Sequence, residues 1–204
     1  MQVRMVGLDL GLKRVGYVVY QNGAIVEADV VTVENFSDLY YFALRKLQNA
    51  VVVCEVPVPF GKSPTTILQL AAQVGIVWTV VEEMFCLTRP DVKSVLLHTT
   101  RAKDKDVRAR LKAAIENYEI IVEPHVKLKG DAWSALAVLY AYFVDPAACH
   151  KGQSGIWTNL TRKFRAALQL CKIEDDEKLF RHLVEEANKD GMDKSQSEQE
   201  TVIG

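Results

Sequence analysis

The start of the chain has the alternation of apolar and polar positions that is typical of β-strands. Residues 3–10, 15–20 and 24–33 predict three strands, because each run is rich in β-branched and aromatic residues. Asn22-Gly23, between the second and third runs, is a strong signal for a tight hairpin. The chain is therefore predicted to begin with an antiparallel meander.

After the meander, strand-type and helix-type patterns follow each other. Helices are predicted over residues 38–48, 65–84, 92–97, 104–117 and 131–143, and strands over residues 50–55, 86–88 and 120–122. Ser37 is the predicted N-cap of the first helix. Three prolines and Gly61 exclude regular structure over residues 56–64. This order predicts a mixed α/β sheet with helices on both faces.

The length fits one domain with an appendage, or one large domain. The chain has 204 residues, of which 49% are hydrophobic, so it can bury a full core. We expect the main domain at residues 1–146 and a C-terminal helical extension at residues 147–188, which begins with a linker over 147–155. The polar residues 189–204 are expected to form an acidic tail without fixed structure.

The sequence favours a cytoplasmic protein, in the host cytoplasm if the chain is viral. No apolar run approaches the length that crosses a bilayer, and the N-terminus lacks a signal-type segment, so no membrane partner is expected. The four cysteines have no paired spacing, which predicts reduced, packed thiols and no zinc site. The four histidines have no metal-ligand spacing either.

The net charge of −1 hides two regions of opposite sign. Residues 174–204 hold ten acidic and four basic residues, whereas residues 1–173 hold 16 acidic and 21 basic residues. Eight bases against three acids lie between residues 89 and 112, and five bases with no acid lie between residues 151 and 172. A basic body with an acidic tail favours nucleic acid as a partner.

Three acidic residues stand where a charge is costly. Asp9 interrupts an apolar run, Glu55 ends another at residues 51–54, and Asp131 opens a third at residues 132–142. No basic partner is evident beside any of them in the sequence, and carboxylates are the ligands that Mg²⁺ prefers. We therefore predict a divalent metal site in which neighbouring strands place Asp9 beside Glu55, and the last helix brings Asp131 against them.

Each acid also has a structural interpretation. Asp9 could belong to an ordinary turn, Glu55 could reach water at a strand end, and Asp131 could cap a helix, which is worth about 1 kcal/mol. The small residues Ala132, Ser134, Ala135 and Ala137 favour the functional interpretation, because they let the last helix lie close to the sheet.

These segments together resemble the RuvC-type nucleases, which are Holliday junction resolvases of the RNase H-like superfamily. The resemblance covers residues 3–144 and rests on five motifs in the family's order. The motifs are Val6-Gly7-Leu8-Asp9-Leu10-Gly11 with Val15-Gly16-Tyr17, Val53-Cys54-Glu55, residues 67–82, residues 98–111, and Asp131-Ala132-Trp133-Ser134-Ala135-Leu136-Ala137.

The resemblance implies a fold and a chemistry. The fold is an RNase H-like mixed five-stranded sheet flanked by helices. The activity is Mg²⁺- or Mn²⁺-dependent hydrolysis with two ions, which leaves a 5′-phosphate on four-way DNA cleaved by a homodimer. Asp9, Glu55 and Asp131 would be the metal ligands.

The family's fourth ligand has no counterpart at its expected place. The family carries two acidic, or acidic and histidine, positions three residues apart on the last helix, and here one register puts Ser134 at the second position. The other register puts Leu128 at the first position. The weaker substitutes are Asp104, Glu123 and His125.

The resemblance also implies where DNA binds. Phe60 lies in the loop where the family carries an aromatic that probes the junction, although it could simply pack on its own turn. The candidate phosphate contacts are Lys62, Arg101, Lys103, Lys105, Arg108 and Arg110, whose alternative is a solvated helix face. By analogy we expect a dimer interface on residues 65–84, and the C-terminal extension could dock a protein partner.

Three other functions compete with a junction resolvase. The chain could be an RNase H-like nuclease for another structured nucleic acid, such as flapped DNA or an RNA precursor. It could be a junction-binding protein that has lost a metal ligand and no longer cleaves. Asp9-Leu10-Gly11 also fits the phosphate loop of the actin and sugar-kinase class, but the chain has no room for that class's second lobe.

Overall fold

The computed structural model describes residues 4–56, 64–81 and 83–151, and within them the chain forms a five-stranded mixed sheet in the order β3-β2-β1-β4-β5. The strands are β1 (Met5–Leu10), β2 (Arg14–Gln21), β3 (Ala24–Thr32), β4 (Val51–Val56) and β5 (Glu83–Thr88). The first three are antiparallel, whereas β4 runs parallel to both β1 and β5. The predicted mixed five-stranded fold is confirmed.

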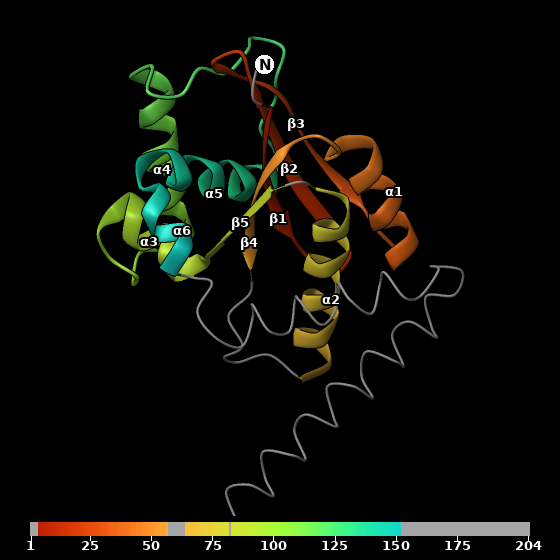
Figure 1. The fold of residues 1–204 in the computed structure, drawn as a ribbon. Coiled ribbons are helices and arrows are strands. Elements are labelled where there is room, and N and C mark those ends of the chain that lie inside the picture. The colour runs from red at the N-terminus through yellow and green to blue at the C-terminus, as the bar shows by residue number, and fades with distance from the viewer. Residues whose placement is uncertain (1–3, 57–63, 82, 152–204) are drawn as a thin grey trace, which may run out of the picture.

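Helices cover both faces of the sheet (Figure 1). One face carries α1 (Phe36–Lys46) and α2 (Pro64–Val80), and the other carries α5 (Ala132–Val144). Around α5 lie α3 (Arg89–Leu97), α4 (Asp104–Glu116) and α6 (Pro146–Lys151). Two apolar cores result, one on each side of the sheet.

The alternation of side chains along β1 and β4 decides which face the two strand-end acids take. Leu8, Leu10 and Cys54 belong to the core under α1 and α2, whereas Val53 belongs to the core under α5. Because successive residues of a strand point to opposite faces, Asp9 and Glu55 project to the α5 side.

The predicted Asn22-Gly23 hairpin is confirmed, with φ of 56° and 87° at the two residues.

Several predicted boundaries differ from the structure. The first helix is capped by Asn35 and not by Ser37, because the Asn35 side chain accepts the Asp38 backbone N–H at 2.8 Å. Helix α2 ends at Val80, and β5 starts at Glu83, so it is longer than the strand predicted at 86–88.

The predicted strand at residues 120–122 is reduced to a single bridge. Val122 pairs with Ile25, the Ile25 N–H donates to the Ile121 carbonyl at 2.8 Å, and the Glu123 N–H donates to the Ile25 carbonyl at 3.0 Å. This segment fastens the chain between α4 and α5 to β3 without adding a sixth strand.

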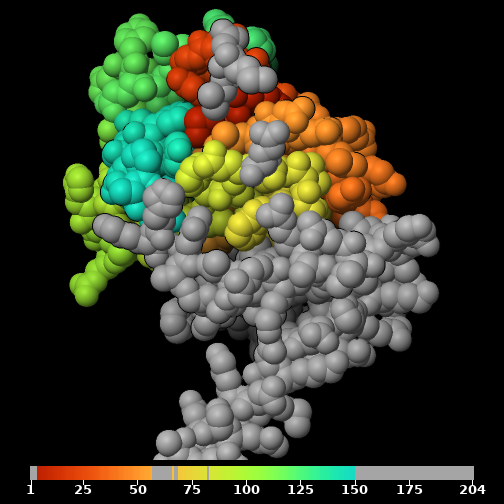
Figure 2. Space-filling view, viewed as in Figure 1, coloured from red at the N-terminus to blue at the C-terminus, as the bar shows by residue number. Residues whose placement is uncertain are grey.

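The linker predicted from Ala147 begins instead as helix α6, in which Cys149 is fully buried. This helix packs against α5 and β5 and lies on the face shown in Figure 2. The remainder of the predicted linker and extension, and the predicted tail, lie outside the described residues. Among the helices in the described part of the chain, none is long and apolar enough to span a bilayer.

Candidate active site

Asp9 and Glu55 are direct neighbours across two parallel strands. The register of β1 and β4 pairs Asp9 with Glu55, at the carboxyl ends of both strands. Adjacent strands lie about 4.8 Å apart, so the two side chains leave the sheet close together on the α5 face. These strand ends point down in Figure 1, to the end of the sheet from which α3 starts. The predicted side-by-side placement of the two acids is confirmed.

Asp131 reaches the same place because Gly16 has no side chain. Gly16 pairs with Asp9 in the register of β1 and β2. A Cβ atom at Gly16 would lie 2.4 Å from the carbonyl carbon and oxygen of Asp131, so the start of α5 rests directly on the backbone of β2. Asp131 occupies the N-cap position of α5 but makes no side-chain capping hydrogen bond. Helix capping therefore does not explain why an acidic residue stands at position 131.

Glu55 has a basic partner that the sequence does not place beside it. Nη1 of Arg89, the first residue of α3, lies 3.0 Å from Oε2 of Glu55, and the two side chains are 26% and 14% exposed. Nη2 of Arg89 donates to the Ser134 hydroxyl at 2.9 Å, and its Nε lies 3.7 Å from Oδ1 of Asp104. The fold thus brings a guanidinium between β4, α4 and α5, which corrects the expectation that these acids lack a basic partner.

Asp131 is paired with an arginine as well, but more loosely. Nε of Arg14 lies 3.2 Å from Oδ2 of Asp131, and the side chains are 65% and 32% exposed. Exposed ion pairs contribute little stability, since water and salt screen them. The Arg14 guanidinium can therefore leave Asp131 at small cost, whereas Arg89 is held by the partly buried Glu55 and Ser134 and lies near the exposed Asp104.

The backbone positions and the chemistry of the three acids fit a divalent cation, because carboxylate oxygens are the ligands that Mg²⁺ and Mn²⁺ prefer. Among the side chains that the structure describes, however, no three Asp, Glu, His or Cys groups converge to hold a metal ion. Two of the three carboxylates are instead engaged by Arg14 and Arg89.

Neither of the two expected places supplies a fourth acidic ligand. Ser134 lies three residues after Asp131 on α5, and its hydroxyl accepts a hydrogen bond from Arg89. Leu128 is packed against the core under α5. Asp104 is bound by Lys93 at 3.0 Å, and Nε2 of His125 lies 3.2 Å from the Val26 carbonyl.

A basic cleft opens beside the acids. It has a volume of about 510 Å³ and lies between α4 and α5. Its lining includes Arg89, Lys105, Arg108, Lys112, Asp131 and Ser134. Two predicted phosphate contacts, Lys105 and Arg108, thus share one cleft with a candidate metal ligand, and Lys112 joins them although it was not predicted.

Among the described residues, three further predicted nucleic-acid contacts do not line this cleft. Arg101 and Lys103 are exposed near the start of α4. Arg110 is engaged within the protein, since Nη2 contacts Glu119 at 2.7 Å and donates to the Tyr140 hydroxyl at 2.9 Å. We therefore leave Arg110 out of the binding surface. Phe60 and Lys62 lie outside the described residues.

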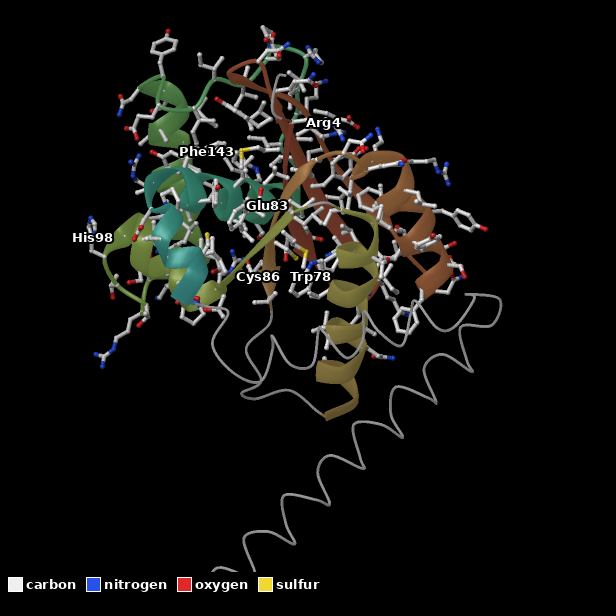
Figure 3. The ribbon with its side chains drawn as sticks, in the orientation of Figure 1. Arg4, Trp78, Glu83, Cys86, His98 and Phe143 are labelled. Carbon is white, nitrogen blue, oxygen red and sulfur yellow. The ribbon has the colours of Figure 1, made fainter. Side chains whose placement is uncertain are left out.

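The described cysteines and His98 take no part in the site. Burial raises the pKa of Cys86 to about 12, and it also raises the pKa of Cys54, so neither thiol is a ready nucleophile or metal ligand. His98 ends α3 in the left-handed conformation and points away from the body of the structure (Figure 3).

The charged groups around Arg89 should make the stability of the protein depend on pH. The hydrogen bond from Lys93, with the nearby Arg89 charge, lowers the pKa of Asp104. Wild type should therefore exceed Asp104→Asn in stability above the ordinary aspartate pKa of about 3.9, and this advantage should vanish as the pH falls through the lower folded-state pKa. The difference should stay below about 1 kcal/mol, because Asp104 is 70% exposed. Urea unfolding between pH 7 and pH 3 measures it, and an advantage that grows toward acid pH would contradict the sign.

Comparison with known proteins supports the fold. The sequence matches no protein-family model and no curated protein. The structure is similar to that of RuvC from Thermus thermophilus, with a TM-score of 0.55 and 14% identity, over 70% of this chain and 94% of that chain. It is also similar to T. thermophilus RuvC in complex with Holliday junction substrate, with a TM-score of 0.57 and 14% identity, over 70% and 93% of the two chains. At this identity the likeness establishes a RuvC-like fold and not an activity.

Proposed function

We propose that this chain is a metal-dependent endonuclease that cleaves four-way or otherwise branched DNA by phosphodiester hydrolysis. The observation that carries the proposal is the pairing of Asp9 with Glu55 at the strand ends, with Asp131 held against Gly16 beside them. The backbones that carry these three acids are adjacent although they come from segments far apart in the sequence, and Asp131 also lines a basic cleft. The likeness to a RuvC structure that contains a Holliday junction supports the choice of substrate.

In this proposal Asp9, Glu55 and Asp131 bind Mg²⁺ or Mn²⁺. Such an ion, when bound, activates water and stabilises the leaving oxygen of a phosphodiester. Arg14 lies beside Asp131 and is mostly exposed. When the cation binds, the Arg14 guanidinium can therefore release the Asp131 carboxylate and bind a DNA phosphate instead. The 5′-phosphate at the product end follows from the family resemblance.

Lys105 and Arg108 are proposed as phosphate contacts. Replacing Arg108 by Ala should weaken junction binding and reduce by about one the slope of log affinity against log salt concentration. Lys105→Ala should do the same. Filter binding between 50 and 200 mM salt measures both quantities.

Arg45→Ala is the matched control, because Arg45 is exposed on α1, on the opposite face of the sheet. It should leave the slope unchanged. Equal slopes for all three variants would remove the α4 cleft from the proposed surface.

A second candidate is a junction-binding protein that does not cleave. It is favoured by Arg89, which engages Glu55, and by Ser134, which stands where the resemblance expects an acid. The two candidates share the basic cleft and differ only in whether the three acids support hydrolysis.

A panel of labelled substrates tests the proposed substrate class. A four-way junction, a flapped duplex, a linear duplex and an RNA hairpin should be incubated with the full chain in Mg²⁺ or Mn²⁺. We expect nicks in the junction, which DNA ligase can seal because they carry a 5′-phosphate. Cleavage of the RNA hairpin alone would replace branched DNA by another structured nucleic acid.

We further propose a homodimer, because a four-way junction has two equivalent strands to cut. The interface is proposed on α2 by analogy with the fold. Light scattering of the purified chain, with and without junction DNA, tests the stoichiometry. A monomer in both samples would overturn it.

A further inference from the structure

We propose that Arg89 takes the place of one of the two divalent cations, so that the site binds a single metal ion and presents the guanidinium to the DNA phosphate. This inference rests on the proposed function, since it assigns a role within the same site. The side chain is anchored on both sides, by Glu55 on β4 and by Ser134 on α5. It also lines the basic cleft, so its partly exposed end faces the space that DNA would enter.

The charges near the acids favour one cation over two. Asp9, Glu55, Asp131 and Asp104 bring four negative charges, and Arg14, Arg89 and Lys93 bring three positive ones, which leaves one negative charge. The Arg89 guanidinium is a fixed positive charge. A second divalent ion beside this guanidinium would meet a fixed like charge with few carboxylates to offset it.

Ser134 contributes to the replacement of the second metal ion by Arg89. An acid at this position would attract a metal ion, whereas the hydroxyl accepts a hydrogen bond from Arg89. The guanidinium carries five N–H groups in a planar fork that suits phosphate oxygens. Its contacts with Glu55 and Ser134 leave donors for a phosphate, so Arg89 can supply the positive charge that a second ion would otherwise bring.

The test is the number of Mn²⁺ ions bound by the full chain without DNA. Titrating Mn²⁺ and following the electron paramagnetic resonance signal of the unbound ion should give one ion per wild-type chain. Arg89→Met with Ser134→Asp should give two, because the cation is removed and an acid stands at position 134. Arg89→Lys should keep one, because it retains the charge. Circular dichroism checks that each variant is folded.

Several results would overturn the inference. Two ions in wild type, one ion in the Arg89→Met, Ser134→Asp variant, or no ion in wild type would each show that Arg89 does not set the number. Wild type that cleaves a junction while binding two ions would refute the role of Arg89 and leave the proposed nuclease standing. One bound ion with no cleavage of any branched DNA would refute the nuclease and leave the ion count standing.

Discussion

Asp9→Asn is expected to abolish metal-dependent cleavage of a four-way junction while leaving junction binding intact. Asp9 stands between Glu55 on β4 and Gly16 on β2, so it is the acid at the centre of the proposed metal site. The change to an amide keeps the shape of the side chain and removes its charge, which weakens cation binding. A lost metal contribution of several kcal/mol corresponds to a decrease of about a thousandfold or more in rate.

Single-turnover cleavage and gel-shift binding measure the two properties separately. Asp29→Asn is the matched control, because Asp29 is an exposed acid on β3 and belongs to the same sheet. It should cleave at the wild-type rate. Wild-type cleavage by Asp9→Asn would remove Asp9 from the proposed site.

Gly16→Ala is expected to destabilise the fold strongly. The added methyl group would lie 2.4 Å from the Asp131 carbonyl, and because that neighbour is backbone, the start of α5 has to move away from the sheet. Overpacking of this kind costs about 2–3 kcal/mol. The same shift carries Asp131 away from Asp9, so cleavage should be lost even where the variant is folded.

Urea unfolding compares Gly16→Ala with Gly23→Ala. Gly23 has φ of 87° with nothing within 4 Å of an added Cβ, so its substitution meets backbone strain and no clash. That strain costs about 1 kcal/mol. Equal losses of stability in the two variants would contradict the close approach of α5 to β2.

The acids could be placed from the sequence because strand rules are local and geometric. Asp9 and Glu55 end apolar runs of strands that are parallel neighbours, and such ends meet at one edge of a sheet. The small residues at the start of α5 correctly indicated that this helix lies close to the sheet. The role of Gly16 in admitting Asp131 needed the structure, because it depends on which strand lies under the helix.

The arginine partners could not be predicted in the same way. Arg89 is 34 residues from Glu55 and 45 from Ser134 along the chain, so only the packing of α3 against α5 brings them together. A local signal did exist for its helix, since Thr88 and Asp91 form a capping box around the start of α3. The capping box determines where α3 starts, but it does not determine which groups the Arg89 side chain contacts.

The cap of α1 and the last predicted strand show how local signals compete. Asn35 and Ser37 are both good capping residues two positions apart, and the sequence does not rank them. Residues 120–122 have a strand-type composition, but only Val122 pairs with the free edge of β3, because the chain turns directly afterwards, where the Val126 N–H donates to the Glu123 carbonyl.

The central claim is that the three acids form a hydrolytic metal site, and its most direct test is cleavage of a labelled four-way junction beside a linear duplex of the same sequence. The full chain is incubated with each substrate in Mg²⁺, in Mn²⁺ and in EDTA. We expect paired nicks near the junction centre in either metal, an intact linear duplex, and no cleavage in EDTA. Junction binding without cleavage in either metal would contradict the claim and leave the non-cleaving junction-binding protein as the function.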